Sequence, residues 1–499
     1  MIDVLSSRVA VALRRFRVRL PGTRGGSYDP PILRERRDTF VNCLVATAVL
    51  LMVIMAILLL IFISVGLREE DHDILSEETP RGNPRVLNPQ IVVGTVQTMV
   101  YTTGKLVLMG VLLCTVRVRS SIRTFVYPED GVCAITMFSS LFESRGNTLT
   151  PPYKDDLMHF LDTASHHRKT QYGFGIDHEN ETLMSTLIAN PTTKTYLDDM
   201  WSHRVYHYGQ VNTPPILKGI STLQYVTQSA KGLQMISQLM NDNVDPTRQP
   251  SYTVLHYPLI YEWMAADVAK ALTSYPVDLL VAFGYTAYSD YGKKNCRVVP
   301  PVLHSTELLD SFLLNDTYPV RLVRVMSALV ELKKQQTIRT ELAVSLGMGG
   351  RWYVPALPDN AVGTPGNYPL GHRCTTVSGG DAPPRNQISS IVEACEDPNY
   401  NQTFSYDNTF QAMFAFDKSD RTLFTYDSAA SLRFKLCETK KKVTDLRYNL
   451  VADDIQYEDI DDLCGYGSYS RLRLLNRLAL FLAKNYTSPR HESACKLLT

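Results

Sequence analysis

The sequence lacks an excess of charge of either sign. Its 499 residues include 51 Lys and Arg against 50 Asp and Glu, a formal net charge of +1. Such a balance provides no positive field to attract a polyanion, which argues against nucleic acid as a partner. The 27 Gly and 27 Pro are scattered without a period. We find no repeat of about 20 to 50 residues, so a solenoid or propeller is not expected. With 44% hydrophobic residues, the composition predicts one large globular domain with appendages.

Charge is missing altogether from residues 41–67. At about 1.5 Å per residue, this segment is long enough to cross a hydrocarbon layer of about 30 Å as a helix. Because residues 1–40 precede it, we interpret it as an uncleaved signal anchor. Those 40 residues hold nine Arg against four acidic residues, which predicts a basic cytosolic tail and a lumenal or extracellular remainder. The expected protein is therefore single-pass and type II.

Two further patterns favour that orientation. Sequons for N-glycosylation begin at Asn180, Asn315, Asn401 and Asn485, all beyond the hydrophobic segment. Of nine cysteines, Cys43 lies inside the segment and eight follow it: Cys114, Cys133, Cys296, Cys374, Cys395, Cys437, Cys464 and Cys495. An even number in an oxidising compartment predicts four disulfides.

Beyond a polar, turn-rich stalk at 68–104, short apolar runs alternate with segments of helical period. The expected strands are 105–116, 131–138, 170–176, 204–209, 251–257, 277–285, 341–349 and 446–457. The expected helices include 183–201, 222–240, 262–275, 321–335 and 470–485. This α/β pattern predicts a (β/α)8 TIM barrel over residues 105–488, followed by a short tail at 489–499. Residues 351–447 are too many for one βα connection, which predicts an inserted subdomain there.

The order of these landmarks resembles glycoside hydrolase family 18, the chitinase fold, in a divergent, membrane-tethered arthropod form. Cys114 and Cys133 resemble a pair that the family bridges early in its barrel, and 183–201 resembles the helix before its catalytic strand. GMGGRWYVPALPDNAVGTPGNYPLG resembles the turn and loop that open the family's inserted α+β subdomain, and IVEAC and DIDDLCGYG resemble segments flanking its eighth strand. The resemblance implies disulfides Cys114–Cys133 and Cys395–Cys464. It leaves the other four cysteines open, with Cys296–Cys374 and Cys437–Cys495 as the combination we favour.

The family's catalytic signature, DxxDxDxE, is absent. In that chemistry a Glu protonates the glycosidic oxygen while an Asp orients the substrate's acetamido group. Placing the motif on VYHYGQVNTP, residues 205–214, puts Val205, Tyr208, Gln210 and Asn212 at its four acidic positions. An amide has no proton to give, and residues 204–214 hold no carboxylate in any register. The resemblance therefore implies a pseudoenzyme with no catalytic residue and no cofactor.

The expected sugar-binding groove is also altered. The family's eighth-strand Trp is missing, since the three Trp are Trp201, Trp263 and Trp352, and the strand offers Tyr457 instead. In the sixth strand Tyr285 is present, but Thr286 replaces an acid. We expect an N-acetylglucosamine-containing glycan, or else a protein partner, to bind at Tyr208, Gln210, Asn212, Tyr285, Trp352 and Tyr457.

Two alternatives remain open. An active hydrolase could use a relocated acid from the expected strand ends, where the candidates are Asp177, Asp290, Asp454 and Glu458. A structural or signalling ectodomain would bind no sugar. His203 and His207 are four residues apart, but we expect them at a strand entry rather than on one helix face, so no metal site is predicted. Because the context of a phosphate loop is missing, we interpret Gly347 to Gly350 as a strand-to-loop turn. The sequence holds no GxSxG motif, so it indicates no serine nucleophile.

Overall fold

The computed structural model describes residues 108–117, 125–143, 146–147, 152–176, 189–211, 221–241, 251–287, 296–304, 319–335, 338–356, 370–375, 387–417 and 419–499. All of them belong to one compact unit. Several predictions lie outside these ranges: the basic tail, the anchor at 41–67, the stalk, and residues Asn180, Asn315, Asp177, Asp290 and Asn212. Within the described ranges, no helix combines the length and the apolar character that a membrane span requires.

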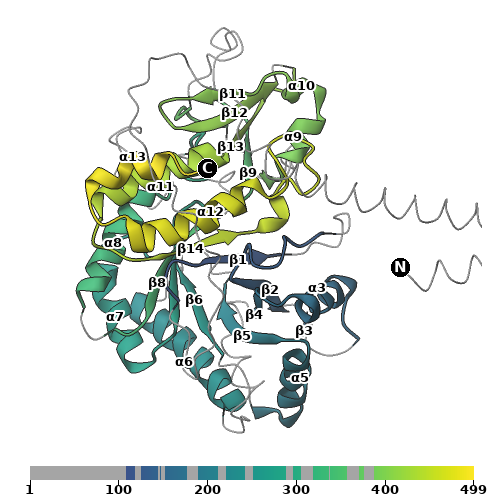
Figure 1. Cartoon of the computed structure of the whole chain (residues 1–499), viewed down its shortest axis with the longest axis vertical. Helices are drawn as coiled ribbons and strands as arrows, with labels where there is room; N and C mark the ends of the chain where they lie inside the picture. Colours follow the sequence, from purple (N-terminus) through teal and green to yellow (C-terminus); the bar gives the residue numbers. More distant parts are fainter. Residues whose placement is uncertain are drawn as a thin grey trace, which may run out of the picture. The chain divides into compact units, whose positions relative to one another are not determined.

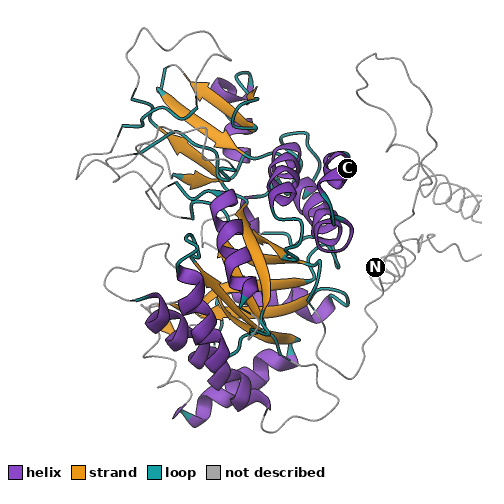
Figure 2. Cartoon of the chain, turned by 90° about the vertical axis from the view of Figure 1, so that its left-hand side faces the viewer, coloured by secondary structure: helices purple, strands orange, loops and turns teal. Residues whose placement is uncertain are grey.

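Eight parallel strands form a closed barrel, in the order β1-β14-β8-β7-β6-β5-β4-β2, with β1 also paired to β2. Figures 1 and 2 show this barrel with its surrounding helices. The strands are β1 (Leu112–Val116), β2 (Ile135–Glu143), β4 (Gln171–Ile176), β5 (Val205–Gln210), β6 (Thr253–Tyr257), β7 (Leu279–Phe283), β8 (Glu341–Gly347) and β14 (Asn449–Asp453). The two-residue β3 (Gly146–Asn147) adds antiparallel to β2. The eight expected strands and the TIM barrel are thereby confirmed.

Helices follow most of the barrel strands. They are α3 (Asp155–His166), α5 (Pro191–Ser202), α6 (Thr222–Asn241), α7 (Met264–Ser274), α8 (Leu322–Lys334), α11 (Ala429–Lys442) and α12 (Ser470–Leu480). A further helix, α13 (Glu492–Lys496), comes after α12 without an intervening strand. In the segment expected to be helical from residue 183, the described helix α5 begins at Pro191, because the Asn190 side chain accepts a hydrogen bond from the Thr192 amide. This cap and a proline in the first turn are typical start signals.

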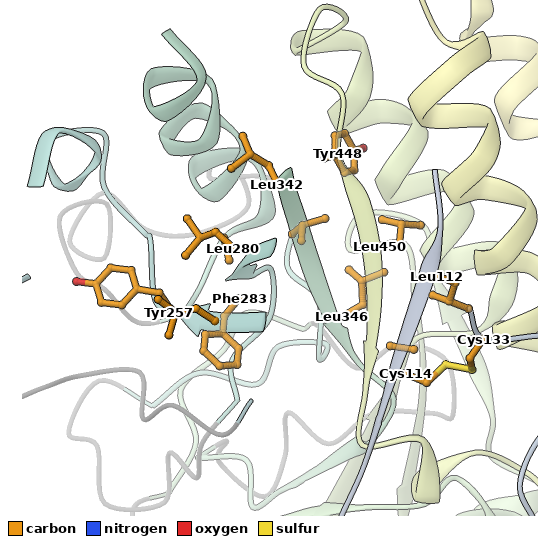
Figure 3. Packing of buried hydrophobic residues seen from close by; sticks show 14 of the residues in the cluster. Leu112, Cys114, Cys133, Tyr257, Leu280, Phe283, Leu342, Leu346, Tyr448 and Leu450 are labelled. Atoms are coloured by element: carbon orange, nitrogen blue, oxygen red, sulfur yellow. A yellow bond between two sulfur atoms is a disulfide. The ribbon is translucent and has the colours of Figure 1, made fainter. Parts of the chain in front are cut away.

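Each barrel strand has two buried faces. Side chains of one parity form a cluster drawn only from strands and their ends, which we call the inner cluster: Leu108, Leu113, Ile135, Met137, Val211, Tyr252, Val254, Leu279, Val281, Ala343 and Val451. Side chains of the other parity pack against the helices, and Figure 3 shows part of this outer cluster. Because successive side chains of a strand alternate between faces, a residue two positions along a strand from a member of the inner cluster also points into the barrel.

A second, antiparallel sheet is built from the chain between β8 and β14. Its order is β10-β9-β13-β12-β11, with β9 (Gly350–Tyr353), β10 (Ile388–Ser389), β11 (Ser405–Asp407), β12 (Ala412–Asp417) and β13 (Thr422–Tyr426). Two short helices accompany it, α9 (Val392–Glu396) and α10 (Pro398–Asn401). Gly350 lies at the turn between the sheets, where a Cβ atom would meet the Phe424 ring at 2.0 Å. Glycine is therefore required at this close approach.

Four disulfides join the eight cysteines of this unit: Cys114–Cys133, Cys296–Cys374, Cys395–Cys464 and Cys437–Cys495. All four expected pairs are confirmed. The last pair links α11 to α13, so the short tail expected at 489–499 contains a helix that is bonded to α11. Of the described sequons, Asn401 and Asn485 are both exposed, as glycosylation requires.

Candidate functional site

The inward side chains of β5 and its end are His207, Gly209 and Val211. Val211 belongs to the inner cluster, and a Cβ atom on Gly209 would lie 2.9 Å from the Met137 methyl group, which is also in that cluster. Tyr208 has the opposite parity and belongs to the outer cluster. Its ring packs edge-on against Phe174, with centroids 5.2 Å apart.

This alternation corrects the register expected for the catalytic motif by one residue. The last three acidic residues of DxxDxDxE are two apart, so they share a face, and only the inward face reaches a ligand in the barrel mouth. The matching positions are Arg204, His207, Gly209 and Val211, rather than Val205, Tyr208, Gln210 and Asn212. Tyr208 and Gln210 are 0% and 5% exposed and point toward the helices. The conclusion that no carboxylate occupies the motif holds in the corrected register.

His207 fills the barrel interior as a neutral hydrogen-bonding group. Its Nδ1 accepts a hydrogen bond from the Tyr252 amide at 3.1 Å, so Nε2 carries the proton and donates to the Gln171 side-chain oxygen at 2.8 Å. His203 lies at the end of α5, with Nδ1 2.9 Å from the Asp199 carbonyl oxygen. The two histidines therefore lie in different environments, one inside the barrel and one at a helix end.

The β5 side of the barrel is tightly packed and apolar. A Cβ atom on Gly173 of β4 would lie 2.5 Å from the Met137 sulfur and 2.6 Å from the His207 Cβ. Val211 is 4% exposed among Met137, Tyr252 and Val254. Among the residues that the structure describes, this side offers no carboxyl group and little room for one.

A polar cluster lies across the barrel at the C-terminal ends of β1, β6, β7, β8 and β14. We define it as Thr115, His256, Tyr285, Ser345 and Asp453. The Thr115 hydroxyl donates to an Asp453 carboxyl oxygen at 3.0 Å, and His256 Nδ1 lies 3.9 Å from the other oxygen. The hydroxyls of Ser345 and Tyr285 also interact with this carboxyl group. Asp453 therefore lies at the centre of the polar cluster, with Thr115 hydrogen-bonded to it.

Burial controls the charges of this polar cluster. Asp453 is 3% exposed, and burial together with the neighbouring Asp454 raises its pKa to about 7, although the three hydroxyls act in the opposite direction. Burial lowers the pKa of His256 to about 3 and raises that of Tyr285 well above its usual value. Near neutral pH, the polar cluster thus combines a partly protonated acid with a neutral imidazole and a neutral phenol.

More exposed groups surround the polar cluster at the barrel rim. Asp454 follows β14 with φ 62°, and its carboxyl group lies 3.8 Å from Arg117 Nε. Their side chains are 22% and 42% exposed. Gln456 connects both, since its side chain accepts from the Arg117 amide at 2.9 Å and donates to Asp454 at 3.2 Å. The rim therefore presents a cation and a carboxylate next to the buried Asp453.

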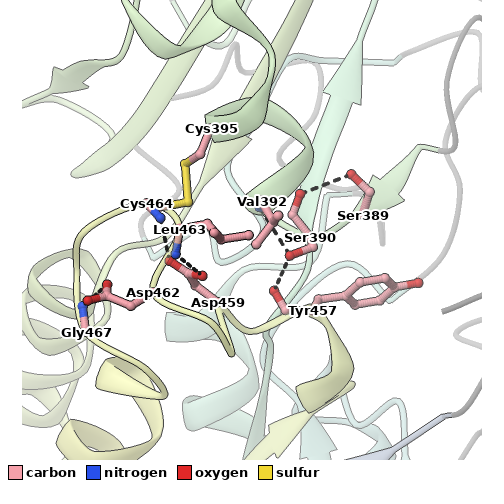
Figure 4. The surroundings of a disulfide bond; sticks show 10 residues. All are labelled: Ser389, Ser390, Val392, Cys395, Tyr457, Asp459, Asp462, Leu463, Cys464 and Gly467. Carbon is pink, nitrogen blue, oxygen red and sulfur yellow. Dashed lines mark hydrogen bonds between the residues drawn. A yellow bond between two sulfur atoms is a disulfide. The ribbon is translucent and has the colours of Figure 1, made fainter. Parts of the chain in front are cut away.

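Tyr457 lies where the barrel meets the second sheet. Its carbonyl oxygen accepts from the Ser390 hydroxyl at 3.1 Å, and its ring would lie 3.0 Å from a Cβ on Gly349. The following loop is held by Asp459, which accepts the Leu463 and Cys464 amides at 2.9 and 2.8 Å, and by the Cys395–Cys464 disulfide (Figure 4). Tyr457 is 9% exposed and is thus held rigidly at the site.

Two residues expected at the site have structural surroundings instead. Trp352 is 1% exposed and packs in the core of the second sheet, where its indole nitrogen donates to Ser389 at 2.7 Å. Glu458 is paired with Arg471, with 2.9 Å between Oε1 and Nε and both side chains almost fully buried. Burial raises the pKa of Glu458 even against this cation. Neither side chain is presented to a ligand.

Of the six residues expected in the groove, the structure therefore brings Tyr285 and Tyr457 to this end of the barrel. The Tyr285 ring packs directly on Gly347, where a Cβ atom would lie 2.5 Å from the ring. The ring can take this position because residue 347 has no side chain. Asp453 and His256 were missed from the sequence. Asp453 is two residues after Val451, so both side chains lie on the same face of β14. The sequence would predict that Asp453 points inward only if it were known that Val451 does.

Comparison with solved structures identifies the fold. The chain is similar to human YKL-39, described as a pseudo-chitinase with retained chitooligosaccharide binding properties, at 13% identity and a TM-score of 0.50, covering 74% of this chain and 98% of that one. A structure of YKL-39 in the presence of chitooligosaccharides gives 14% identity, a TM-score of 0.51, and coverage of 74% and 99%. A class V chitinase from Nicotiana tobaccum gives 11% identity, a TM-score of 0.48, and coverage of 73% and 98%. No protein-family model and no curated protein sequence matches. The resemblance expected from the sequence is thus confirmed at the level of the fold.

Proposed function

We propose that this chain, which has the chitinase-like fold, binds an N-acetylglucosamine-containing glycan at the C-terminal end of its barrel without hydrolysing it. The observation that carries the proposal is the inward face of β5, where His207, Gly209 and Val211 occupy the motif positions. Hydrolysis by the mechanism of the family needs a general acid on that face. These three residues have no carboxyl group to act as one. Binding needs only groove residues such as Tyr285 and Tyr457.

The proposal includes a type II membrane arrangement. The uncharged segment 41–67 and the arginine-rich residues before it support this topology. The four disulfides are those expected of a chain that folds in an oxidising compartment. The barrel would then face the lumen or the extracellular space, where a glycan partner is available.

The test uses the full-length chain purified in detergent. Calorimetric titration with N-acetylglucosamine oligomers measures binding, and chromatography of the same mixtures after long incubation measures cleavage. We expect binding without new products. Absence of binding to any oligomer would reject the proposal and favour a structural or signalling ectodomain, or a protein partner.

A second candidate function is hydrolysis by a relocated acid. Asp453 favours it, since this carboxyl group with a pKa of about 7 lies at the barrel end where chemistry occurs in this fold. If the wild-type chain releases products, the Asp453→Asn variant should abolish them while Glu458→Gln should not, because Glu458 is held by Arg471. Product release that survives Asp453→Asn would exclude this residue as the acid.

A further inference from the structure

The connection from β6 to α7 carries the most exposed aromatic side chain in the described part of the molecule. Trp263 is 67% exposed, whereas the other two tryptophans, Trp201 and Trp352, are 7% and 1% exposed. Trp263 lies directly before the first residue of α7. Exposing an indole to water forfeits a large burial energy, so a local structure that holds it there calls for an explanation.

The Trp263 ring is held against a second aromatic ring. It stacks on Tyr261 with an interplanar angle of 18° and centroids 5.8 Å apart. Tyr261 is itself packed against the outer cluster, and the Arg324 guanidinium lies 5.1 Å from its ring centroid. A cation over the ring further stabilises this arrangement. The indole is therefore part of a small rigid platform, which we define as Trp263, Tyr261 and Arg324.

The topology places this platform at the same end of the barrel as the polar cluster. Residues 261 and 263 follow the C-terminal end of β6, and Arg324 lies in the first turn of α8, the helix that follows β7. A helix that returns from a parallel strand begins at the C-terminal end of that strand. The platform therefore belongs to the face that presents the groove residues.

The chemistry of the platform fits a pyranose ring. The flat face of a sugar carries C–H groups that pack on an indole, while its hydroxyls need polar partners, which Arg324 and the exposed Glu262 provide. A protein partner fits less well. A stable protein interface buries about 800 Å² on each side, yet among the described residues between 160 and 400, Trp263 is the one large exposed hydrophobic side chain.

We propose that Trp263, supported by Tyr261 and Arg324, is an outer sugar-binding site that contacts glycan units beyond those held at the barrel mouth. This inference rests on the proposed glycan-binding function and adds a length requirement to it. Short oligomers fill the barrel mouth alone. Longer ones also reach the platform and gain affinity there.

The experiment compares trimers and hexamers of N-acetylglucosamine on the full-length chain by calorimetry. Trp263→Ala should weaken hexamer binding about 3- to 10-fold, the range of one aromatic contact, and leave trimer binding unchanged. Trp263→Phe should retain most of the hexamer affinity, because it keeps an aromatic face. Met158→Ala is the matched control, since Met158 is 51% exposed on α3 and should alter neither affinity.

A second readout needs no variant. Since Trp263 is the only well-exposed tryptophan of the three, it dominates quenching of the intrinsic fluorescence by acrylamide. The hexamer should protect it from quenching, and the trimer should not. If the wild-type chain binds the hexamer with neither protection nor loss of affinity in Trp263→Ala, the outer site is rejected while the proposed function stands. If no oligomer binds at all, the proposed function itself fails.

Discussion

At the C-terminal end of the barrel, β5 and β14 lie opposite each other in the ring of strands, and their inward side chains differ in chemistry. The β5 side presents Gly209 and Val211 packed on Met137. The β14 side presents Asp453 with Thr115 bonded to its carboxyl group. One barrel mouth therefore has an apolar, closely packed side and a polar, titratable side.

This contrast shows how a fold can keep its architecture while its chemistry changes place. Pairing of the barrel strands depends on their register and on the alternation of inward and outward side chains. A valine at position 211 is as compatible with that pairing as an acidic residue would be. A catalytic role depends on one functional group at one inward position. Three experiments can test the difference between the apolar side and the polar side.

The first introduces an acid on the apolar side. Val211 is 4% exposed among apolar neighbours, so the Val211→Glu variant must bury an unpaired carboxyl group. We expect the free energy of unfolding to fall by about 3–5 kcal/mol at pH 7, measured by urea denaturation. Val211→Gln is the control for size and polarity. The difference in the free energy of unfolding between Val211→Glu and Val211→Gln should be smaller at pH 5, because the new carboxyl group is more readily protonated there. If this difference is the same at pH 5 and pH 7, the charge of the glutamate is not the cause of the lost stability.

The second tests the packing that closes the apolar side. Gly173→Ala places a Cβ within 2.7 Å of Met137 Sδ and two His207 atoms. We expect a loss of about 1–3 kcal/mol in the free energy of unfolding, the usual cost of overpacking. In a Met137→Ala background, Gly173→Ala should cost less than it does in the wild type, because the clashing sulfur is gone. If Gly173→Ala costs the same in both backgrounds, the clash with His207 rather than with Met137 limits this side.

The third uses pH to test the polar side. An acid with a raised folded-state pKa keeps its proton in the folded protein where the unfolded chain has released it, so Asp453 lowers stability as pH rises from about 4 to 7. His256 acts oppositely, because its lowered pKa makes stability fall as pH drops below about 6.5. Taking the difference between the wild type and the Asp453→Asn variant at each pH isolates the aspartate. The variant should gain about 1–2 kcal/mol relative to wild type between pH 5 and pH 7, whereas parallel stability curves would show that Asp453 is ionised throughout.

Particular residues show where sequence reasoning succeeded and where it did not. The strands were predictable because runs such as those of β7 and β8 are short, apolar and followed by helical periodicity. Aligning the motif on residues 205–214 predicts Tyr208 and Gln210 on the ligand side, but an error of one residue reverses every side chain of a strand. Trp352 was expected in the groove, but its burial depends on the β9–β13 pairing that forms the second core.

Local patterns in the sequence were enough to predict that eight strands alternate with helices, that the eight cysteines beyond residue 67 can pair, and that residues 204–214 hold no carboxylate. These properties follow from local periodicity and from composition. The tertiary structure decided which parity of β5 faces inward, that Asp453 meets Thr115 from 338 residues away, and that Tyr261 holds Trp263 at the surface. Such outcomes depend on pairing between distant segments and on the burial it produces, and burial is what sets the charge of Asp453 and the exposure of each tryptophan.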